Sequence, residues 1–304
     1  MKENRITNEN LTPIPQARFF RAYLQGGVPK AELSANITQH MTLYSSSAAP
    51  LLGDSNDAKL RQNASCVLDV KGVPRNWELN WAVAGVLALQ IASQCGIEMS
   101  GFLVDSNYVP ISRPLIWGHY YDELPEEAIR FADAHTALLE SLLLPERYSR
   151  VTNALRLYQG SLILDNADLA LLGFVGAIES LFSLAPQELA FRLSLLLAKF
   201  LGDEKDAQLK FYNRARSLYT VRSQIAHGDK IDANEEAAAI QIVEKWAPEA
   251  EGLTRLCLKR LLDKNLLALF DSKKRHEALL TELLFVPNLD EALNCIDKGH
   301  GAEP

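Results

Sequence analysis

The chain has few cysteines and histidines, and neither residue type shows the short spacings typical of a metal or redox site. The four cysteines form no CxxC pair, and the six histidines include no HxxxH or HxxH pair. Zinc ligands usually lie close together in sequence. We therefore expect no metal site, and we interpret the cysteines as reduced thiols of a cytoplasmic protein.

Motifs that bind phosphates or carry a hydrolase nucleophile are also missing. The sequence has no GxxxxGK[ST] loop, no GxGxxG after a strand and no GxSxG elbow. This argues against nucleotide hydrolysis, dinucleotide chemistry and α/β-hydrolase chemistry. The longest apolar runs, residues 81–89 and 169–178, are much shorter than the roughly 18 residues that cross a bilayer. We expect no bound cofactor and no membrane partner.

Charge is distributed unevenly along the chain. The net charge of −7 argues against a protein that coats nucleic acid non-specifically. Residues 205–230 have the opposite balance, because their acids, Asp206 and Asp229, are outnumbered by cations. These cations are Lys205, Lys210, Arg214, Arg216, Arg222 and Lys230. Such a stretch is either a solvated helix face or a small footprint for a polyanion.

Apolar residues recur at three- and four-residue spacing through most of the second half of the chain, which predicts helices. The expected helices are residues 168–184, 187–201, 206–226, 235–246, 248–270 and 276–285. We predict a helical domain over residues 148–287, followed by a weakly ordered tail over residues 288–304.

Residues 1–147 differ from the second half in composition, with more proline, asparagine and serine and with shorter apolar segments. They predict an α or α+β region of unknown role. Strands are expected near residues 66–70 and 101–111, and helices near residues 80–92 and 122–144. The expected fold class of the whole chain is therefore mainly α.

The most informative motif is Arg222-Ser-Gln-Ile-Ala-His227, which Gly228 follows at the predicted end of a helix. A guanidinium can hold a phosphate with two hydrogen bonds, and a histidine can transfer a proton near neutral pH. On a regular helix, five residues place these two side chains about 140° apart. They can meet at one ligand if the helix ends between them, or if a partner subunit supplies a second copy. Alternatively, the helix dipole alone favours a histidine at a helix C-terminus.

Glu179 has apolar neighbours on the expected helix 168–184, which directs it toward the core. An unpaired carboxylate there costs free energy, so Glu179 needs a partner. Arg192 or Arg222 could pair with it, and a bond to Arg222 would orient that arginine. Alternatively, Glu179 reaches solvent or closes a purely structural ion pair.

Three segments of the helical half resemble the HEPN superfamily, and most closely its Apea-like branch. They are GAIESLF at residues 176–182, ELAFRLSLLLA at 188–198 and LYTVRSQIAHG at 218–228. The resemblance implies an antiparallel helical bundle, a homodimer and a metal-independent endoribonuclease acting on RNA. It also implies a toxin–antitoxin or anti-phage setting, with an antitoxin or regulatory protein as a further partner.

Under this resemblance, His227 would take the proton from a ribose 2′-hydroxyl or protonate the leaving oxygen, and Arg222 would stabilise the phosphorane. The product would carry a 2′,3′-cyclic phosphate. Supporting residues would be Ser223, Glu179 and Tyr219, and RNA-binding residues would be Lys210, Arg214, Arg216 and Lys230.

The chain departs from the family pattern at Ser223. Active members often carry Asn, Asp or His directly after the arginine, whereas Ser223 can form hydrogen bonds but cannot titrate usefully. The alternative is therefore a catalytically silent helical module for dimerisation and for binding RNA or a protein.

Overall fold

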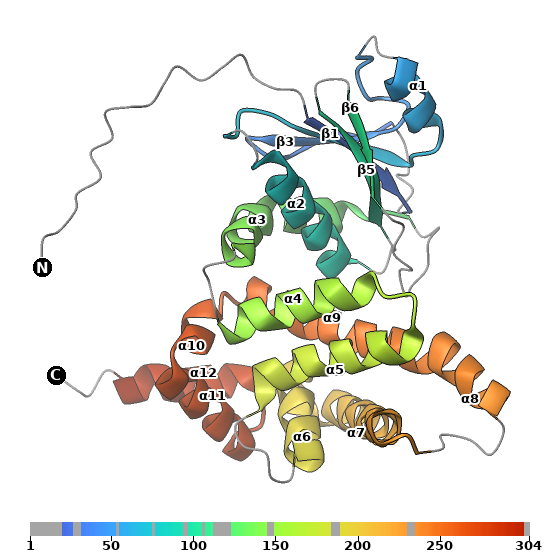
Figure 1. The fold of residues 1–304 in the computed structure, drawn as a ribbon. Coiled ribbons are helices and arrows are strands. Elements are labelled where there is room, and N and C mark those ends of the chain that lie inside the picture. The colour runs from blue at the N-terminus through green and yellow to red at the C-terminus, as the bar shows by residue number, and fades with distance from the viewer. Residues whose placement is uncertain are drawn as a thin grey trace, which may run out of the picture.

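The computed structural model describes residues 20–26, 32–52, 55–74, 77–93, 97–104, 107–111, 123–144, 149–183, 189–229 and 235–300. Within these residues the chain is mainly helical, as the sequence predicts, and its N-terminal region contains an antiparallel sheet. The sheet and its helices form the upper part of the molecule in Figure 1, and the remaining helices form the lower part. The predicted domain boundary at residue 147 lies outside the described residues.

The described sheet has the strand order β2-β3-β4-β1-β5-β6, and every neighbouring pair is antiparallel. Its strands are β1 (Phe20–Gln25), β2 (Ser34–Thr38), β3 (Met41–Ser45), β4 (Cys66–Val70), β5 (Glu98–Val104) and β6 (Asn107–Pro110). The predicted strand at 66–70 coincides with β4, and the segment 101–111 divides between β5 and β6. The sequence-based prediction missed β1, β2 and β3. In β2 and β3, buried residues alternate with more exposed ones, as in half-buried strands.

Both faces of the sheet are covered. Successive residues of a strand point to opposite faces. Ala22 and Leu24 of β1 belong to the main core, to which α2 (Glu78–Ala92) and α3 (Glu126–Leu143) contribute. Tyr23 lies in a smaller cluster with Leu60 of α1 (Ser55–Gln62). The expected helices near 80–92 and 122–144 correspond to α2 and α3.

The helical part packs around α5 and α9. Its helices are α4 (Arg150–Leu162), α5 (Ala167–Phe182), α6 (Leu189–Leu201), α7 (Lys205–His227), α8 (Glu235–Gln241), α9 (Ala247–Asp263), α10 (Leu267–Asp271), α11 (Lys273–Phe285) and α12 (Leu289–His300). Helix α5 packs against α4, α7 and α9, and α9 also contacts α2. One hydrophobic core therefore extends from the sheet into the helical part. None of the described helices combines the length and apolarity needed to cross a membrane.

Helices α8 and α9 are joined by a π-helical turn, η1 (Ile242–Trp246), where the sequence predicts a break at Pro248. Proline has no N–H to donate to the preceding turn, and a wider turn accommodates the missing bond. The expected helix 248–270 is wrong in its length. It ends at Asp263, and Asn265 then adopts a left-handed conformation with φ of 52° before α10 begins.

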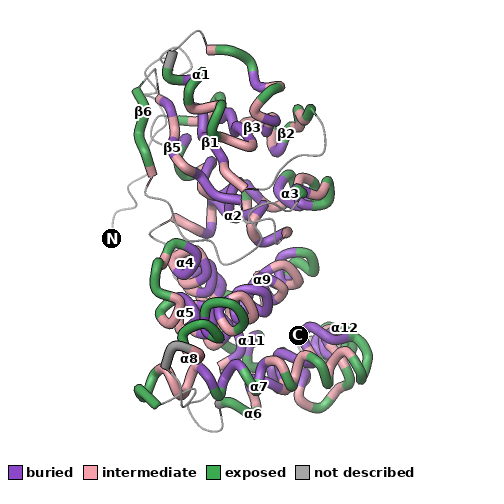
Figure 2. Tube along the Cα trace, turned by 90° about the vertical axis from the view of Figure 1, so that its right-hand side faces the viewer, coloured by how far each residue is buried: buried purple, intermediate pink, exposed green. Residues whose placement is uncertain are grey.

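The expected weakly ordered tail over residues 288–304 is wrong for most of its length. Residues Leu289–His300 form α12, and Leu289, Ala292 and Ile296 are buried, as the purple segments of α12 in Figure 2 show. The side chain of Asn288 accepts a hydrogen bond from the backbone N–H of Glu291 at 3.0 Å and so caps the helix. Three apolar residues at helical spacing provide this short helix with a buried face despite its polar composition. Residues 301–304 lie outside the described part.

Candidate functional site

Helix α7 carries the Arg/His motif and lies against α5. Its buried residues Ala215, Leu218 and Val221 face the core, and Arg222 lies at the edge of this buried stripe. Glu179 has the equivalent place on α5, partly buried beside the buried residues of that helix. Amphipathic packing of two helices therefore brings their border residues together.

Glu179, Tyr219 and Arg222 form a polar cluster between α5 and α7. The Tyr219 hydroxyl donates to Oε1 of Glu179, and Nη2 of Arg222 lies 3.3 Å from the same oxygen. The central guanidinium carbon of Arg222 lies 5.8 Å from the centroid of the Tyr219 ring. Of the two arginines that the sequence suggests as partners for Glu179, the structure pairs it with Arg222.

The cluster is partly shielded from water and keeps hydrogen-bond donors available. Burial raises the pKa of Tyr219, and its bond to Glu179 raises it further. With 8% of its surface exposed, Tyr219 is a neutral donor at physiological pH. The buried Nε of Arg222 has no hydrogen-bond partner within the described residues, and 31% of the Arg222 side chain is exposed. Glu179 therefore orients Arg222, and the exposed part of the Arg222 side chain, not its buried Nε, is open to an anion.

His227 is the last residue of α7 and is exposed to solvent. Gly228 follows in a left-handed conformation, with φ of 72° and ψ of 22°. The N–H groups of Gly228 and Asp229 bond back to carbonyls of the last helical turn, at 3.2 and 2.8 Å. This pattern is a Schellman motif, which ends a helix. The helix therefore ends after His227 and not between Arg222 and His227.

Arg222 and His227 consequently project from different sides of α7. Five residues of helix separate them by about 140° around the axis. Arg222 faces α5, whereas His227 shares the exposed side of α7 with Thr220 and Arg216, the latter about 20° from it by helical geometry. One chain does not bring the arginine and the histidine together, so a site containing both requires a second copy.

The predicted RNA-binding residues differ in their surroundings. Lys210 and Arg216 are exposed, and neither has an ion-pair partner among the described residues. Nη2 of Arg214 donates to Oε2 of Glu249 at 3.1 Å, which neutralises that cation. Lys230 lies outside the described residues.

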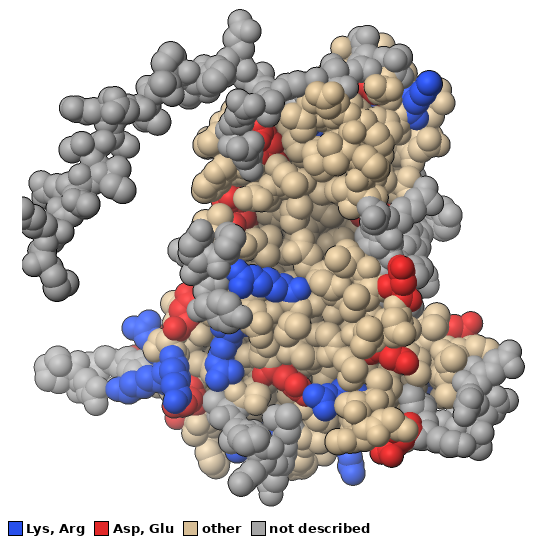
Figure 3. All heavy atoms as spheres, in the orientation of Figure 1, with Lys and Arg blue, Asp and Glu red and all other residues tan. Residues whose placement is uncertain are grey.

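The positive surplus of residues 205–230 is therefore smaller in the folded chain than in the sequence, because Glu249 and Glu179 pair with Arg214 and Arg222. Figure 3 shows cations and acids intermingled over the helical part of one face. The partly buried Ser223, which separates the cluster from the exposed side of α7, is a neutral residue.

The sequence did not predict a buried polar cluster in the sheet. Arg21 is fully buried and donates to Asp69 at 2.6 and 2.9 Å, to Asp57 at 3.0 Å and to the carbonyl of Pro50 at 2.8 Å. Tyr23 donates to Asp57 at 2.7 Å. Burial opposes the ionisation of Asp57, but the bonds from Tyr23 and Arg21 outweigh it and lower the pKa of Asp57. This cluster anchors α1 to the sheet. Its sequence signal is a charged residue within each of two apolar strands.

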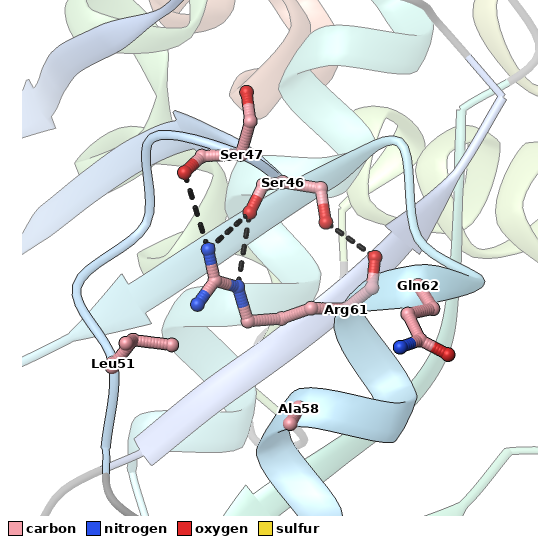
Figure 4. A pocket seen from close by; sticks show the side chains of 6 residues that line it. All are labelled: Ser46, Ser47, Leu51, Ala58, Arg61 and Gln62. Carbon is pink, nitrogen blue, oxygen red and sulfur yellow. Dashed lines mark hydrogen bonds between the residues drawn. The ribbon is translucent and has the colours of Figure 1, made fainter.

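A cavity of about 340 Å³ lies beside α1 (Figure 4). Its lining residues are Ser46, Ser47, Leu51, Ala58, Arg61 and Gln62. Arg61 donates to the backbone carbonyls of Ser46 and Ser47, as the dashed lines in Figure 4 show. These bonds attach the segment that follows β3 to α1. None of the lining side chains can serve as a general base near neutral pH.

No three His, Cys, Asp or Glu side chains come together as a metal site would require, within the ranges that the structure describes. Comparison of the chain with family models, curated proteins and solved structures finds no match. A function has to be inferred from the residues and their geometry.

Proposed function

We propose that the protein is a HEPN-type, metal-independent endoribonuclease that acts as a homodimer. In this proposal, the helices from α4 to α11 are the HEPN-like antiparallel bundle. The observation that carries the proposal is the Glu179–Tyr219–Arg222 cluster. A carboxylate orients a partly exposed arginine there, and a guanidinium has more N–H donors than this carboxylate contact uses. An exposed histidine lies at the end of the same helix.

The chemistry requires a base, an acid and a cation. His227 of one subunit removes the proton from a ribose 2′-hydroxyl, and the 2′-oxygen attacks the adjacent phosphorus. The bond from phosphorus to the 5′-oxygen breaks, and that oxygen takes a proton from the second His227. Arg222 stabilises the charge on the phosphorane. Glu179 is a positioning residue, because it acts through Arg222.

A dimer is part of this proposal because of the placement of Arg222 and His227 on α7. The two side chains lie about 140° apart on one helix. A two-fold axis near the Gly228 end of α7 would bring the Arg222 of each subunit toward the His227 of the other. The composite site would then contain two copies of each residue.

The biological setting proposed is a cytoplasmic toxin–antitoxin or anti-phage system, with an antitoxin or regulatory protein as a partner. The sheet-containing N-terminal region would select the target, the trigger or the partner. This assignment rests on the family resemblance of the helical half.

The test is incubation of the purified protein with labelled single-stranded and structured RNAs in EDTA, beside a His227→Ala variant. His40→Ala is the control, because His40 lies in the β2–β3 turn of the sheet, away from α7. We expect cleavage that persists in EDTA, leaves 2′,3′-cyclic phosphate ends and disappears only in His227→Ala. Cleavage that needs a divalent metal, or that survives in His227→Ala, contradicts the proposal.

A catalytically silent module is the second candidate function, and one observation favours it. Ser223 follows Arg222, and Glu179 already pairs with Nη2 of the Arg222 guanidinium. Such a module would dimerise and bind RNA or a protein without cleaving it. A folded dimer that binds RNA but releases no product favours this candidate.

A further inference from the structure

We propose that Phe191 of α6 and Tyr212 of α7 form a stacking shelf for an unpaired base of single-stranded RNA. The identity of the ligand as RNA rests on the proposed function. The shelf itself lies outside the Arg/His motif and adds a binding site to it.

The shelf is an aromatic pair in which Phe191 is exposed and Tyr212 is partly buried. The ring centroids of Phe191 and Tyr212 are 6.2 Å apart, and the ring planes meet at 76°. Phe191 is 58% exposed, and Leu209, one turn before Tyr212, is 57% exposed. Exposed apolar side chains that cluster together mark binding surfaces, whereas isolated ones do not.

An unpaired cation lies beside this pair. Arg216 follows Tyr212 by one helical turn, whereas Lys210, two residues before Tyr212, is exposed on the opposite side of the same helix. Neither has an ion-pair partner among the described residues, in contrast to Arg214, which is bound to Glu249. Aromatic rings with free cations beside them suit a strand of bases and phosphates, because the rings stack on bases and the cations bind the backbone.

The shelf is aligned with the Glu179–Tyr219–Arg222 cluster. Tyr212 and Tyr219 are seven residues apart, which places them within about 20° of each other around α7. Ten residues of helix separate Tyr212 from Arg222, a rise of about 15 Å. Around the axis, Arg222 lies about 80° from Tyr212 on the side of the cluster, and Arg216 lies about 40° from Tyr212 in the other direction. A strand with a base on the shelf can therefore run along α7 and bring a phosphate to Arg222, while Arg216 binds the backbone on the other side of the stacked base.

The charges favour RNA over a second copy of the chain as the occupant. A two-fold contact through this patch would place Arg216 near its own symmetry mate, and like charges across an interface are unfavourable. An unpaired base is favoured over a duplex, because bases within a duplex are already stacked on each other.

The test measures RNA binding in the His227→Ala background, so that no cleavage occurs. The probe is a short single-stranded RNA with one 2-aminopurine, whose fluorescence falls when the base stacks. We compare the double substitution Phe191→Ala and Tyr212→Ala with Phe285→Ala, which removes a phenylalanine that is 82% exposed at the end of α11. The double variant should bind about tenfold more weakly and lose the quenching, whereas Phe285→Ala should behave as the parent.

Equal affinity and equal quenching in the double variant and its parent would overturn the shelf. A shift of the double variant from dimer to monomer in sedimentation would assign the patch to a second copy and would also overturn it. Failure of the proposed function has a different signature, because wild-type protein then releases no product while the shelf variants still weaken RNA binding. If the wild-type protein cleaves RNA but the Phe191→Ala/Tyr212→Ala variant binds RNA as tightly as its parent, the shelf is rejected and the proposed function is not.

Discussion

The Glu179 carboxylate on α5 and the Arg222 guanidinium on α7 form an ion pair, with Oε1 and Nη2 3.3 Å apart. Tyr219 donates to the same oxygen, so one carboxylate orients two side chains of the neighbouring helix. The pair joins helices that are distant in sequence and places a cation at a partly exposed edge of the core. Both the stability of the α5–α7 contact and the proposed chemistry depend on this pair.

Glu179→Ala should lower the free energy of unfolding by about 1–3 kcal/mol, because it leaves the Tyr219 hydroxyl and the partly buried Arg222 without their acceptor. Urea denaturation measures the change. Glu277→Ala is the control, because Glu277 forms an exposed ion pair with Lys273 one turn away, at 3.9 Å. Its removal should cost less than about 0.5 kcal/mol. Equal losses in the two variants would show that Glu179 contributes no more than a surface acid.

Mixing two inactive variants should restore ribonuclease activity if the site is composite. Arg222→Ala and His227→Ala each disable a homodimer, but a mixed dimer retains one intact Arg222 and one intact His227. We expect activity above that of either homodimer but at least about a hundredfold below wild type after subunit exchange, because a mixed dimer has one His227 and so lacks either the base or the acid. The measurement is RNA cleavage after co-refolding, with mass spectrometry to show that mixed dimers have formed. Mixed dimers without activity would exclude a site shared in this way.

Two glycine-to-alanine substitutions should change stability in opposite directions. Gly228 has φ of 72°, and a Cβ there would meet no atom within 4 Å, so Gly228→Ala should cost about 1 kcal/mol through backbone strain alone. Gly160 lies within α4, and a Cβ there also meets nothing within 4 Å. Gly160→Ala should therefore stabilise the protein by about 0.5–1 kcal/mol. Thermal or urea unfolding of both variants tests the pair, and a stabilising Gly228→Ala would contradict the left-handed helix end.

Glu251 of α9 should make stability depend on pH. It accepts a hydrogen bond from Tyr158 at 2.8 Å and lies 3.3 Å from Arg255. Burial raises the pKa of Glu251 from 4.5 to about 7, although Arg255 and Tyr158 partly oppose this. Because the folded pKa is higher, the folded state holds the proton more tightly than the unfolded state. The stabilisation that the folded protein gains by holding the Glu251 proton is complete below pH 4.5, and it is lost as the pH rises through 7.

Glu251→Gln removes this titration while keeping the shape of the neutral acid. Relative to wild type, the variant should therefore gain about 1–3 kcal/mol in unfolding free energy between pH 5 and pH 7.5. Urea denaturation at the two pH values measures the difference. Glu277→Gln, at an exposed position, should show no such relative gain. A constant difference between Glu251→Gln and wild type would show that Glu251 does not titrate in this range.

Helical spacing was sufficient to locate most helices of the second half, because an amphipathic helix repeats its apolar residues over several turns. It failed at α12, where the buried face has few residues and the flanking sequence is polar. It also placed a break before Pro248, where the chain runs through the π-helical turn Ile242–Trp246 directly into α9. Strands β1 to β3 escaped detection because a strand acquires its hydrogen bonds from partners that are distant in sequence.

For the candidate site, the sequence by itself determined which side chains α7 carries and how they are spaced around its axis. The positions of Arg222 and His227 on one helix already imply an angle of about 140° between them. Tertiary structure decided the rest. The packing of α5 on α7 paired Glu179 with Arg222 rather than Arg192, and Glu249 neutralised Arg214. Packing also placed Phe191 beside Tyr212. Such pairings depend on which helix faces meet, and that is set by the burial of apolar surface across the whole core rather than by any local segment.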